Sequence, residues 1–408
     1  MKLKSILVSI LGAGLFLALA VVAPVSAEPV TVEFWHAMSG GLQDALVALT
    51  DEFNATNGQD ITVELVNQGG YGDLSKKLMA SVAADTLPDM AQVYNNWITG
   101  YLDSVVALDD LVATNFDNYD DILESYRNEG AEYGPIYTIG FNKSIQIFFY
   151  NKTQFAELGL EVPTTWEELE AAGKVALEAT GKPIVGYDDL FGLFQQYVQQ
   201  NGSGFVVDGK IEFNSPEGLE ALTFILNLYK NGYARLAGED VYLSGPFGNG
   251  DVLAYVGSSA GAAYIQPKDF EYGAAPLPKG PVKGSVPQAG TNLALFAQDA
   301  AKQTAAWEYI KFLTSADATV EWAIATGYLP VRTSGFESAT YQAFMEENEV
   351  AQAAYAQVGD QYFEPVFNNS YDIRSLISTE IETAILEEKT PEDAMNTIVE
   401  KVQALLDN

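Results

Sequence analysis

Strand-like and helix-like segments alternate near the start of the chain, and this alternation constrains the fold more than any other feature. Runs rich in β-branched and aromatic residues indicate strands, whereas Leu42, Leu46, Leu49 and Phe53 recur on one helical face. The order is strand, helix, strand, helix, strand, at residues 30–35, 42–53, 61–66, 74–83 and 90–94. Parallel strands need crossover connections, usually helices, so this order predicts a βαβαβ unit and an α/β fold.

Three later helices are expected to begin at polar caps. Thr165, with Glu168 three residues on, has the pattern of a capping box, in which both side chains accept hydrogen bonds from backbone N–H groups. Ser215 and Thr390 each precede a proline, which suits the first turn of a helix because its missing N–H is not needed there.

The chain is strongly acidic and contains no cysteine. Its 408 residues include 55 acidic and 21 basic side chains, with a formal net charge of -34 at pH 7. This charge repels nucleic acid and anionic lipid, so neither is expected as a partner. Without cysteine and with His36 as its single histidine, the chain lacks a thiol nucleophile and a His cluster for metal, and has little material for a Ser–His–Asp triad. We expect no catalytic residue, metal or cofactor.

Residues 1–27 have the pattern of a secretory signal peptide. Lys2 and Lys4 precede an apolar run at 6–22, and small residues at 25–27 suit cleavage. An uncleaved membrane anchor is the alternative, because about 20 apolar residues span a bilayer. Cleavage would leave 381 residues, enough for two lobes, with no cysteine for lipid attachment. A location in a bacterial periplasm is therefore expected.

A series of strings along nearly the whole mature chain matches one family in order. They are residues 34–40 (FWHAMSG), 70–71 (GY), 88–94 (PDMAQVY), 141–144 (FNKS), 149–152 (FYNK), 155–166, 247–261 (FGNGDVLAYVGSSAG), 327–330 (GYLP) and 373–374 (IR). Through these strings the chain resembles the family 1 extracellular solute-binding proteins of ABC importers. Among them it is most similar to the glycerol-3-phosphate-binding branch.

This resemblance implies a type II, maltose-binding-protein-like periplasmic fold, with two α/β lobes joined by a hinge and the ligand held between them. The expected lobes are residues 28–139 with 273–325, and residues 140–272 with 326–408. The resemblance also implies a monomer that delivers its solute to a membrane permease. The expected ligand is glycerol-3-phosphate or a glycerophosphodiester, and the alternative is a sugar or oligosaccharide.

The resemblance further implies a set of ligand-binding residues. In the glycerol-phosphate branch the ligand contacts match Tyr71, Ser144, Ser258, Gly290, Tyr328 and Arg374 of this chain. A guanidinium can bind phosphate through two parallel hydrogen bonds, hydroxyls can donate, and glycine lets a backbone N–H approach closely. Four of these positions also have a structural alternative. Arg374 can pair with a carboxylate, Ser258 or Ser259 can cap a helix, Tyr328 can pack at the hinge, and Tyr71 can be exposed at a loop tip.

Three positions depart from the family pattern at the glycerol end of the site. Asn95 stands where the family has an acidic residue, and Asp188 and Phe191 stand where it has two tryptophans. The amide keeps hydrogen bonding to a polyol, and loss of the indoles would let Asp188 or Asp189 face a cationic group. Alternatively, another loop supplies the missing ring, for example with Trp97. The acidic pair also suggests a glycoside hydrolase, but adjacent carboxylates on a short segment often point apart.

Overall fold

A ten-stranded mixed sheet runs through the computed structural model, which describes residues 29–407 except 208, 241 and 365–368. The strand order is β2-β1-β3-β11-β4-β9-β5-β8, with β10 beside β4 and β12 beside β11, while β6 and β7 form a separate pair. The strands are β1 (Val30–His36), β2 (Ile61–Asn67), β3 (Met90–Val93), β4 (Thr138–Asn151), β5 (Val185–Tyr187), β6 (Val206–Val207), β7 (Lys210–Ile211), β8 (Ala234–Leu236), β9 (Ala254–Ser258), β10 (Tyr272–Ala275), β11 (Val286–Leu295) and β12 (Gln361–Tyr362). The predicted signal peptide lies outside the described residues.

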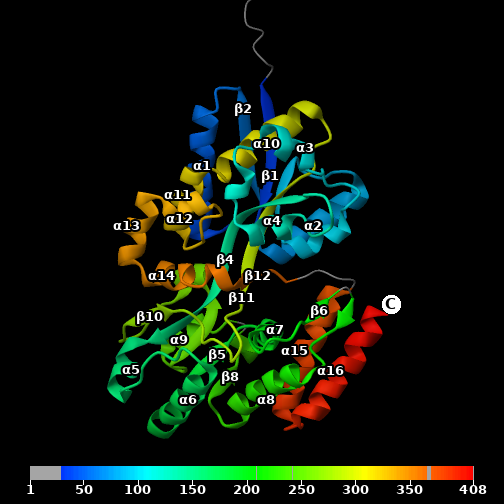
Figure 1. Ribbon diagram of the computed structural model, residues 1–408. Helices are drawn as coiled ribbons and strands as arrows, with labels where there is room; N and C mark the ends of the chain where they lie inside the picture. Colours follow the sequence, from blue (N-terminus) through cyan, green and yellow to red (C-terminus); the bar gives the residue numbers. More distant parts are fainter. Residues whose placement is uncertain (1–28, 208, 241, 365–368, 408) are drawn as a thin grey trace, which may run out of the picture.

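Helices cover the sheet in two lobes, an upper and a lower one in Figure 1. The upper lobe carries α1 (Gly40–Thr56), α2 (Tyr71–Ala84), η1 (Asn95–Gly100), α3 (Asp109–Asn115), η2 (Tyr119–Asp121), α4 (Glu124–Gly130), α10 (Ala300–Leu313) and α11 (Ala316–Thr326). The lower lobe carries α5 (Lys152–Leu158), α6 (Trp166–Thr180), α7 (Leu190–Gln200), α8 (Pro216–Lys230), η3 (Gly238–Asp240), α9 (Ser244–Asn249), η4 (Ser259–Tyr264), α15 (Ser370–Leu386) and α16 (Pro391–Leu406). None of the helices in the described residues is both long and apolar enough to cross a membrane.

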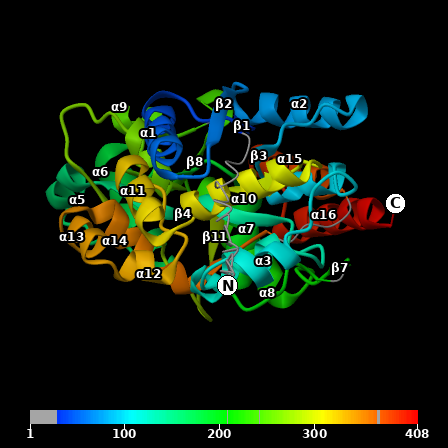
Figure 2. The ribbon, with the colours of Figure 1, turned by 90° about the horizontal axis from the view of Figure 1, so that it is seen from above.

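The remaining helices lie along one edge of the molecule. They are α12 (Thr333–Glu337), α13 (Ala339–Glu347), α14 (Glu349–Tyr355) and η5 (Val358–Asp360). Figures 1 and 2 place α12 to α14 at the edge opposite α15 and α16. Buried residues of α14 belong to the same apolar cluster as the core of the lower lobe. This C-terminal segment therefore runs beside the junction of the lobes before it returns to the lower lobe.

The predicted βαβαβ unit is confirmed at the start of the upper lobe. β1 pairs in parallel with β2 and with β3, and α1 and α2 form the crossovers. The predicted apolar face of α1 buries Leu46, Leu49 and Phe53. Phe53 packs on Tyr309 of α10, with ring centroids 5.0 Å apart.

Two long antiparallel strands connect the lobes (Figure 1). The first half of β4 pairs with β11, and its second half pairs with β9 and β10 of the lower lobe. The end of β11 pairs with β3 of the upper lobe, and the pairing of β11 with β4 has a register shift between Thr291 and Asn292. Side chains in the middle of these strands consequently lie where the lobes meet.

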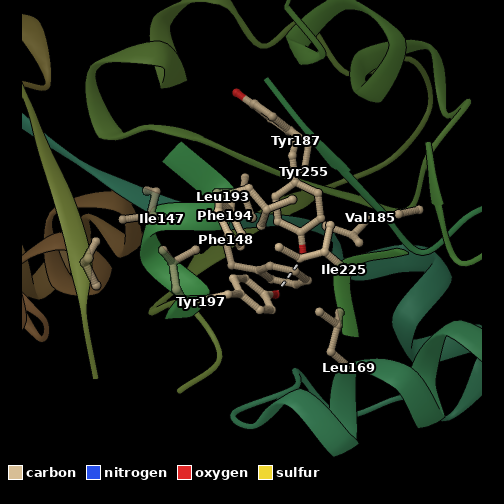
Figure 3. Close-up of a cluster of buried hydrophobic side chains, with 14 of the residues drawn as sticks. Ile147, Phe148, Leu169, Val185, Tyr187, Leu193, Phe194, Tyr197, Ile225 and Tyr255 are labelled. Carbon is tan, nitrogen blue, oxygen red and sulfur yellow. Dashed lines mark hydrogen bonds between the residues drawn. The ribbon is translucent and has the colours of Figure 1, made fainter. Parts of the chain in front are cut away.

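Aromatic packing fills the core of the lower lobe (Figure 3). The Trp166 ring stacks on Tyr197 at 4.6 Å, and the Tyr197 hydroxyl lies 3.0 Å from the hydroxyl of Tyr187. Burial raises the pKa of both phenols, so they remain protonated and can satisfy each other. This core fixes α6 and α7 against β5.

The three predicted helix caps are confirmed. Thr165, Ser215 and Thr390 accept from backbone N–H groups three residues on, at 3.2, 3.0 and 3.1 Å. The Glu168 carboxylate reaches back over the cap and accepts from the N–H of Thr164, one residue before the N-cap, at 2.7 Å.

Candidate functional site

Three half-buried aromatic side chains form a cluster at the carboxyl ends of β2 and β3. Tyr71 begins α2, Tyr94 directly follows β3, and Trp97 lies in η1. The ring centroids of Tyr71 and Tyr94 are 5.0 Å apart, and those of Tyr94 and Trp97 are 5.2 Å apart, both nearly edge to face. In open α/β sheets, ligands bind outside the carboxyl ends of strands, so this cluster occupies a position suited to binding.

Hydrogen bonds join this cluster to the strand that connects the lobes. The buried Asn142 of β4 donates through Nδ2 to the Tyr71 hydroxyl at 3.1 Å. The phenol of Tyr328, in the loop after α11, lies near Tyr71 and Asn142, and Tyr328 and Tyr71 each affect the pKa of the other. Its ring stacks on Trp322 of α11, with centroids 5.8 Å apart. Two phenols predicted as ligand contacts therefore lie side by side.

Arg374 approaches from the first turn of α15 in the lower lobe. Its guanidinium lies 4.9 Å from the Phe191 ring centroid and donates to both oxygens of Glu364 at 2.5 and 2.6 Å. Its other terminal nitrogen donates to Asp189, which also accepts from the N–H of Phe191. The predicted cation is therefore held between an aromatic ring and two carboxylates.

These charges come from the lower lobe and act on a residue of the upper lobe. Burial raises the pKa of Tyr94, Tyr328 and Tyr242 raise it further, and the positive charge of Arg374 opposes the increase. The charge of Arg374 therefore acts on the aromatic cluster from the other lobe. We call the set the interlobe site, and it comprises Tyr71, Tyr94, Trp97, Asn142, Asp189, Phe191, Tyr328, Glu364 and Arg374.

The charge balance of the interlobe site is negative near Arg374. Burial alone would lower the pKa of Arg374, but attraction to Glu364 and Asp189 raises it above its ordinary value. Burial raises the pKa of Glu364, and the guanidinium opposes that change. The single cation of Arg374 therefore already has two acidic partners.

Two predicted residues are committed to other contacts or to the strand core. Asn95 is buried, donates to the Glu132 carboxylate at 2.8 Å and accepts from the Thr138 hydroxyl at 3.4 Å. Ser144 lies in β4 opposite Ala289 and is 2 % exposed. Their part in ligand binding stays a prediction, and in this structure neither belongs to the hydrogen-bonded group around Tyr71.

Two further predicted residues have local structural roles. Ser258 ends β9 and caps η4 by accepting from the N–H of Ala260 at 3.2 Å, which matches the capping alternative. Gly290 has a φ of +97°, and a Cβ there would lie 2.0 Å from the carbonyl oxygen of Asn142. Glycine at this position is thus required by the close approach of β11 to β4.

Replacing Gly290 by alanine is expected to destabilise the protein because the backbone of β4 blocks the new methyl group. Gly134 has a similar φ of +101°, but a Cβ at this position would meet nothing within 4 Å, so Gly134→Ala is the matched control. We expect Gly290→Ala to lower the free energy of unfolding by about 1–3 kcal/mol more than the control. Urea unfolding followed by circular dichroism measures both, and equal losses would contradict the packing explanation.

The two predicted replacements of the family tryptophans lie on the lower lobe. Phe191 is buried beneath Arg374 and packs edge to face on Phe205 at 5.4 Å. Asp188 accepts from the N–H of Leu243 at 2.7 Å, and burial raises its pKa to about 6. Asp189, rather than Asp188, contacts Arg374.

Sequence reasoning did not select three members of the site, Tyr94, Asn142 and Glu364. Tyr94 closes the string PDMAQVY, and its position after a parallel strand was the available signal. Glu364 lies in no periodic segment and ten residues before its partner, so no local pattern indicated it. Two exposed phenols, Tyr242 and Tyr264, also act on Tyr94 and Tyr328.

The sequence itself carries the signature of one family over most of its length. Residues 48–350 match the family described as bacterial extracellular solute-binding protein. The chain belongs to this family. The predicted two-lobed α/β fold and the similarity to the glycerol-3-phosphate-binding branch are both confirmed.

Relatives with known ligands fall into two groups. The sn-glycerol-3-phosphate-binding periplasmic protein UgpB of Salmonella typhimurium is 26% identical, over 92% of each chain. UgpB from Mycobacterium tuberculosis, solved with glycerophosphocholine, has a TM-score of 0.81 and 25% identity, over 93% of this chain and 99% of that one. The cyclic alpha-maltosyl-1,6-maltose binding protein from Arthrobacter globiformis has a TM-score of 0.83 and 28% identity, over the same shares.

Family membership establishes the general role. Proteins of this family are the substrate-binding components of ABC importers, bind small molecules and work with membrane permeases, and they are not enzymes. Some of these relatives bind phosphate esters and others bind sugars, so the ligand class depends on the residues of the interlobe site.

Proposed function

We propose that this protein captures a neutral oligosaccharide between its lobes and delivers it to an ABC importer. The observation that carries this choice is the state of Arg374, whose terminal nitrogens already donate to Glu364 and Asp189. A phosphate monoester would have to enter beside two carboxylates or displace them. A neutral polyhydroxylated ligand meets no such repulsion.

The surroundings of Arg374 also suit a sugar. Tyr71, Tyr94 and Trp97 supply ring faces and edges on the upper lobe, and such rings bury large areas at a low entropic cost. Phenols, the asparagine amide and carboxylates then supply donors and acceptors for hydroxyl groups. The similarity to the cyclic maltosyl-maltose binder supports the same class.

Groups from both lobes give the ligand a means to close the protein. A sugar that stacks on Tyr94 and also hydrogen-bonds Asp189 or Glu364 would bind the closed form better than the open form. A ligand shifts such an equilibrium only by this difference in affinity. During closure, the backbone dihedral angles of the connecting strands β4 and β11 would change.

A glycerophosphodiester with a cationic head is the second candidate. The retained Arg374 and its two carboxylates could divide a zwitterion between them, with phosphate near the guanidinium and the cation near Glu364 or Asp189. The similarity to the UgpB proteins favours this candidate. Free glycerol-3-phosphate, with an uncompensated negative charge, fits less well.

Calorimetry with a short ligand panel tests the proposal. We expect maltotriose or a cyclic maltosyl-maltose to bind, and glycerol-3-phosphate to bind at least about 100-fold more weakly, a difference of nearly 3 kcal/mol. Glycerophosphocholine is the third arm. Tight binding of either phosphate ester without sugar binding would contradict the proposal.

Removing Trp97 is expected to weaken sugar binding without unfolding the protein. Trp97→Ala should lower affinity about 10- to 100-fold, because a half-buried indole next to Tyr94 loses its contact area with the ligand. Titration calorimetry measures the affinity, and the thermal midpoint of the same sample controls for folding. Unchanged affinity would place the ligand elsewhere.

A further inference from the structure

A buried chain of side-chain hydrogen bonds runs beneath the tyrosine pair of the interlobe site. The backbone N–H of Ala37 donates to Oε1 of Gln92 at 3.0 Å. Nε2 of Gln92 donates to Oδ1 of Asn142 at 2.9 Å, and Nδ2 of Asn142 donates to the Tyr71 hydroxyl at 3.1 Å. Gln92 and Asn142 are both fully buried, so water does not compete for these bonds.

The backbone N–H of Ala37 determines which group donates in each of these hydrogen bonds. A backbone N–H can only donate, so the oxygen of Gln92 must face Ala37, and its amino group must then face Asn142. The Thr291 hydroxyl also donates to Oδ1 of Asn142. A flipped Asn142 would direct its amino group at the amino group of Gln92. The amide of Asn142 therefore has one compatible orientation, with its amino group toward the tyrosines.

The proton count of the tyrosine pair follows from that orientation. Tyr71 accepts from Asn142 at 3.1 Å, and burial raises the pKa of both phenols so that each keeps its proton. Asn142 cannot accept from Tyr71 in this orientation, because its amino group faces the phenol. At most one phenolic proton can bridge the two tyrosines, so at least one proton has no acceptor within this group.

We propose that Asn142 is a positioning residue that makes Tyr71 accept a hydrogen bond, so that the tyrosine pair keeps a phenolic proton to donate to an acceptor oxygen of the ligand. The inference rests on the proposed function for the identity of the ligand, but not for the direction of the bonds. An ether, hydroxyl or phosphoryl oxygen satisfies the site. A ligand group that can only donate, such as an ammonium, does not.

The direction of the bonds is tested without any ligand. In the full chain with 15N-labelled asparagine and 13C-labelled tyrosine, we expect NOEs from both side-chain amide protons of Asn142 to the Tyr71 and Tyr328 rings. Their exchange with solvent should be slow. NOEs from these protons to the Thr291 side chain instead would mean a flipped amide and would overturn the proposal.

Binding tests the consequence, with maltotriose as the probe. An ionised aspartate only accepts, so in Asn142→Asp the Tyr71 phenol would donate inward and its proton would point away from the ligand. We expect at least a tenfold loss of affinity above neutral pH. Asn54→Asp is the matched control, because Asn54 bridges Val63 within the upper lobe, and it should change affinity less than twofold.

The outcomes separate the two proposals. Wild-type affinity in a folded Asn142→Asp variant would overturn the role of Asn142. If the variant does not fold, the NOEs of the wild-type protein still decide the direction of the bonds. Failure of the wild-type protein to bind maltotriose would contradict the sugar proposal and leave the NOE result standing.

Discussion

Replacing Lys143 by methionine is expected to cost about 3–5 kcal/mol of the free energy of unfolding, because it leaves a carboxylate buried without its partner. Lys143 is fully buried in β4, and its Nζ lies 2.6 Å from Oε2 of Glu129 and 3.1 Å from Oδ1 of Asn292. Gln288 of β11 donates to the same Glu129 oxygen at 3.1 Å. The ion pair thus joins α4 to both connecting strands.

Urea unfolding of three variants measures this effect. Lys174→Met is the matched control, since Lys174 and Glu178 form an exposed pair at 4.0 Å, and its loss should cost less than about 0.5 kcal/mol. The double variant Lys143→Met with Glu129→Gln should recover much of the stability, because no charge is left unpaired. A loss for Lys143→Met no larger than the control would contradict the importance of this buried pair.

Replacing Arg374 by methionine is expected to give a loss of stability that depends on pH. Without the guanidinium, Glu364 and Asp189 face each other, and the folded-state pKa of Glu364 should rise further above the unfolded value. Carboxyl groups of this kind destabilise the fold above their folded-state pKa, and the penalty disappears as the pH falls through it. We expect the free energy of unfolding to fall by about 1–3 kcal/mol near neutral pH and by less near about pH 4.5. Equal losses at both pH values would show that the two carboxylates do not depend on the guanidinium.

The same variant separates the two ligand candidates. A phosphodiester that depends on Arg374 should lose about 10- to 150-fold in affinity, as expected for a charge-assisted hydrogen bond of about 1.5–3 kcal/mol. A neutral sugar held mainly by aromatic rings should lose less. Calorimetry with maltotriose and glycerophosphocholine on wild type and Arg374→Met makes the comparison.

Local sequence patterns predicted the elements whose formation depends only on residues nearby in the sequence. The βαβαβ start and the caps at Thr165, Ser215 and Thr390 are all confirmed, because side-chain periodicity and capping act within a few residues. The family resemblance supplied Tyr71, Tyr328 and Arg374, and these residues lie at the junction of the lobes. Their contact with a ligand stays a prediction.

The surroundings of those residues could not be predicted in the same way. Asn95 and Tyr94 are adjacent, yet the Asn95 side chain contacts Glu132 and Thr138 while the Tyr94 ring packs on Tyr71. Adjacent residues at a strand end point in different directions, so a shift of one position changes the partner completely. Sequence alone does not show which neighbour faces the site.

By itself, the sequence determined the fold class, the family, the acidic charge and the absence of cysteine chemistry, since these follow from composition, periodicity and ordered strings. Only the tertiary structure decided the electrostatic state of Arg374. Its partners Asp189 and Glu364 lie 185 and 10 residues away along the chain. Charge interactions depend on distance in space, which folding sets and which sequence separation does not reveal.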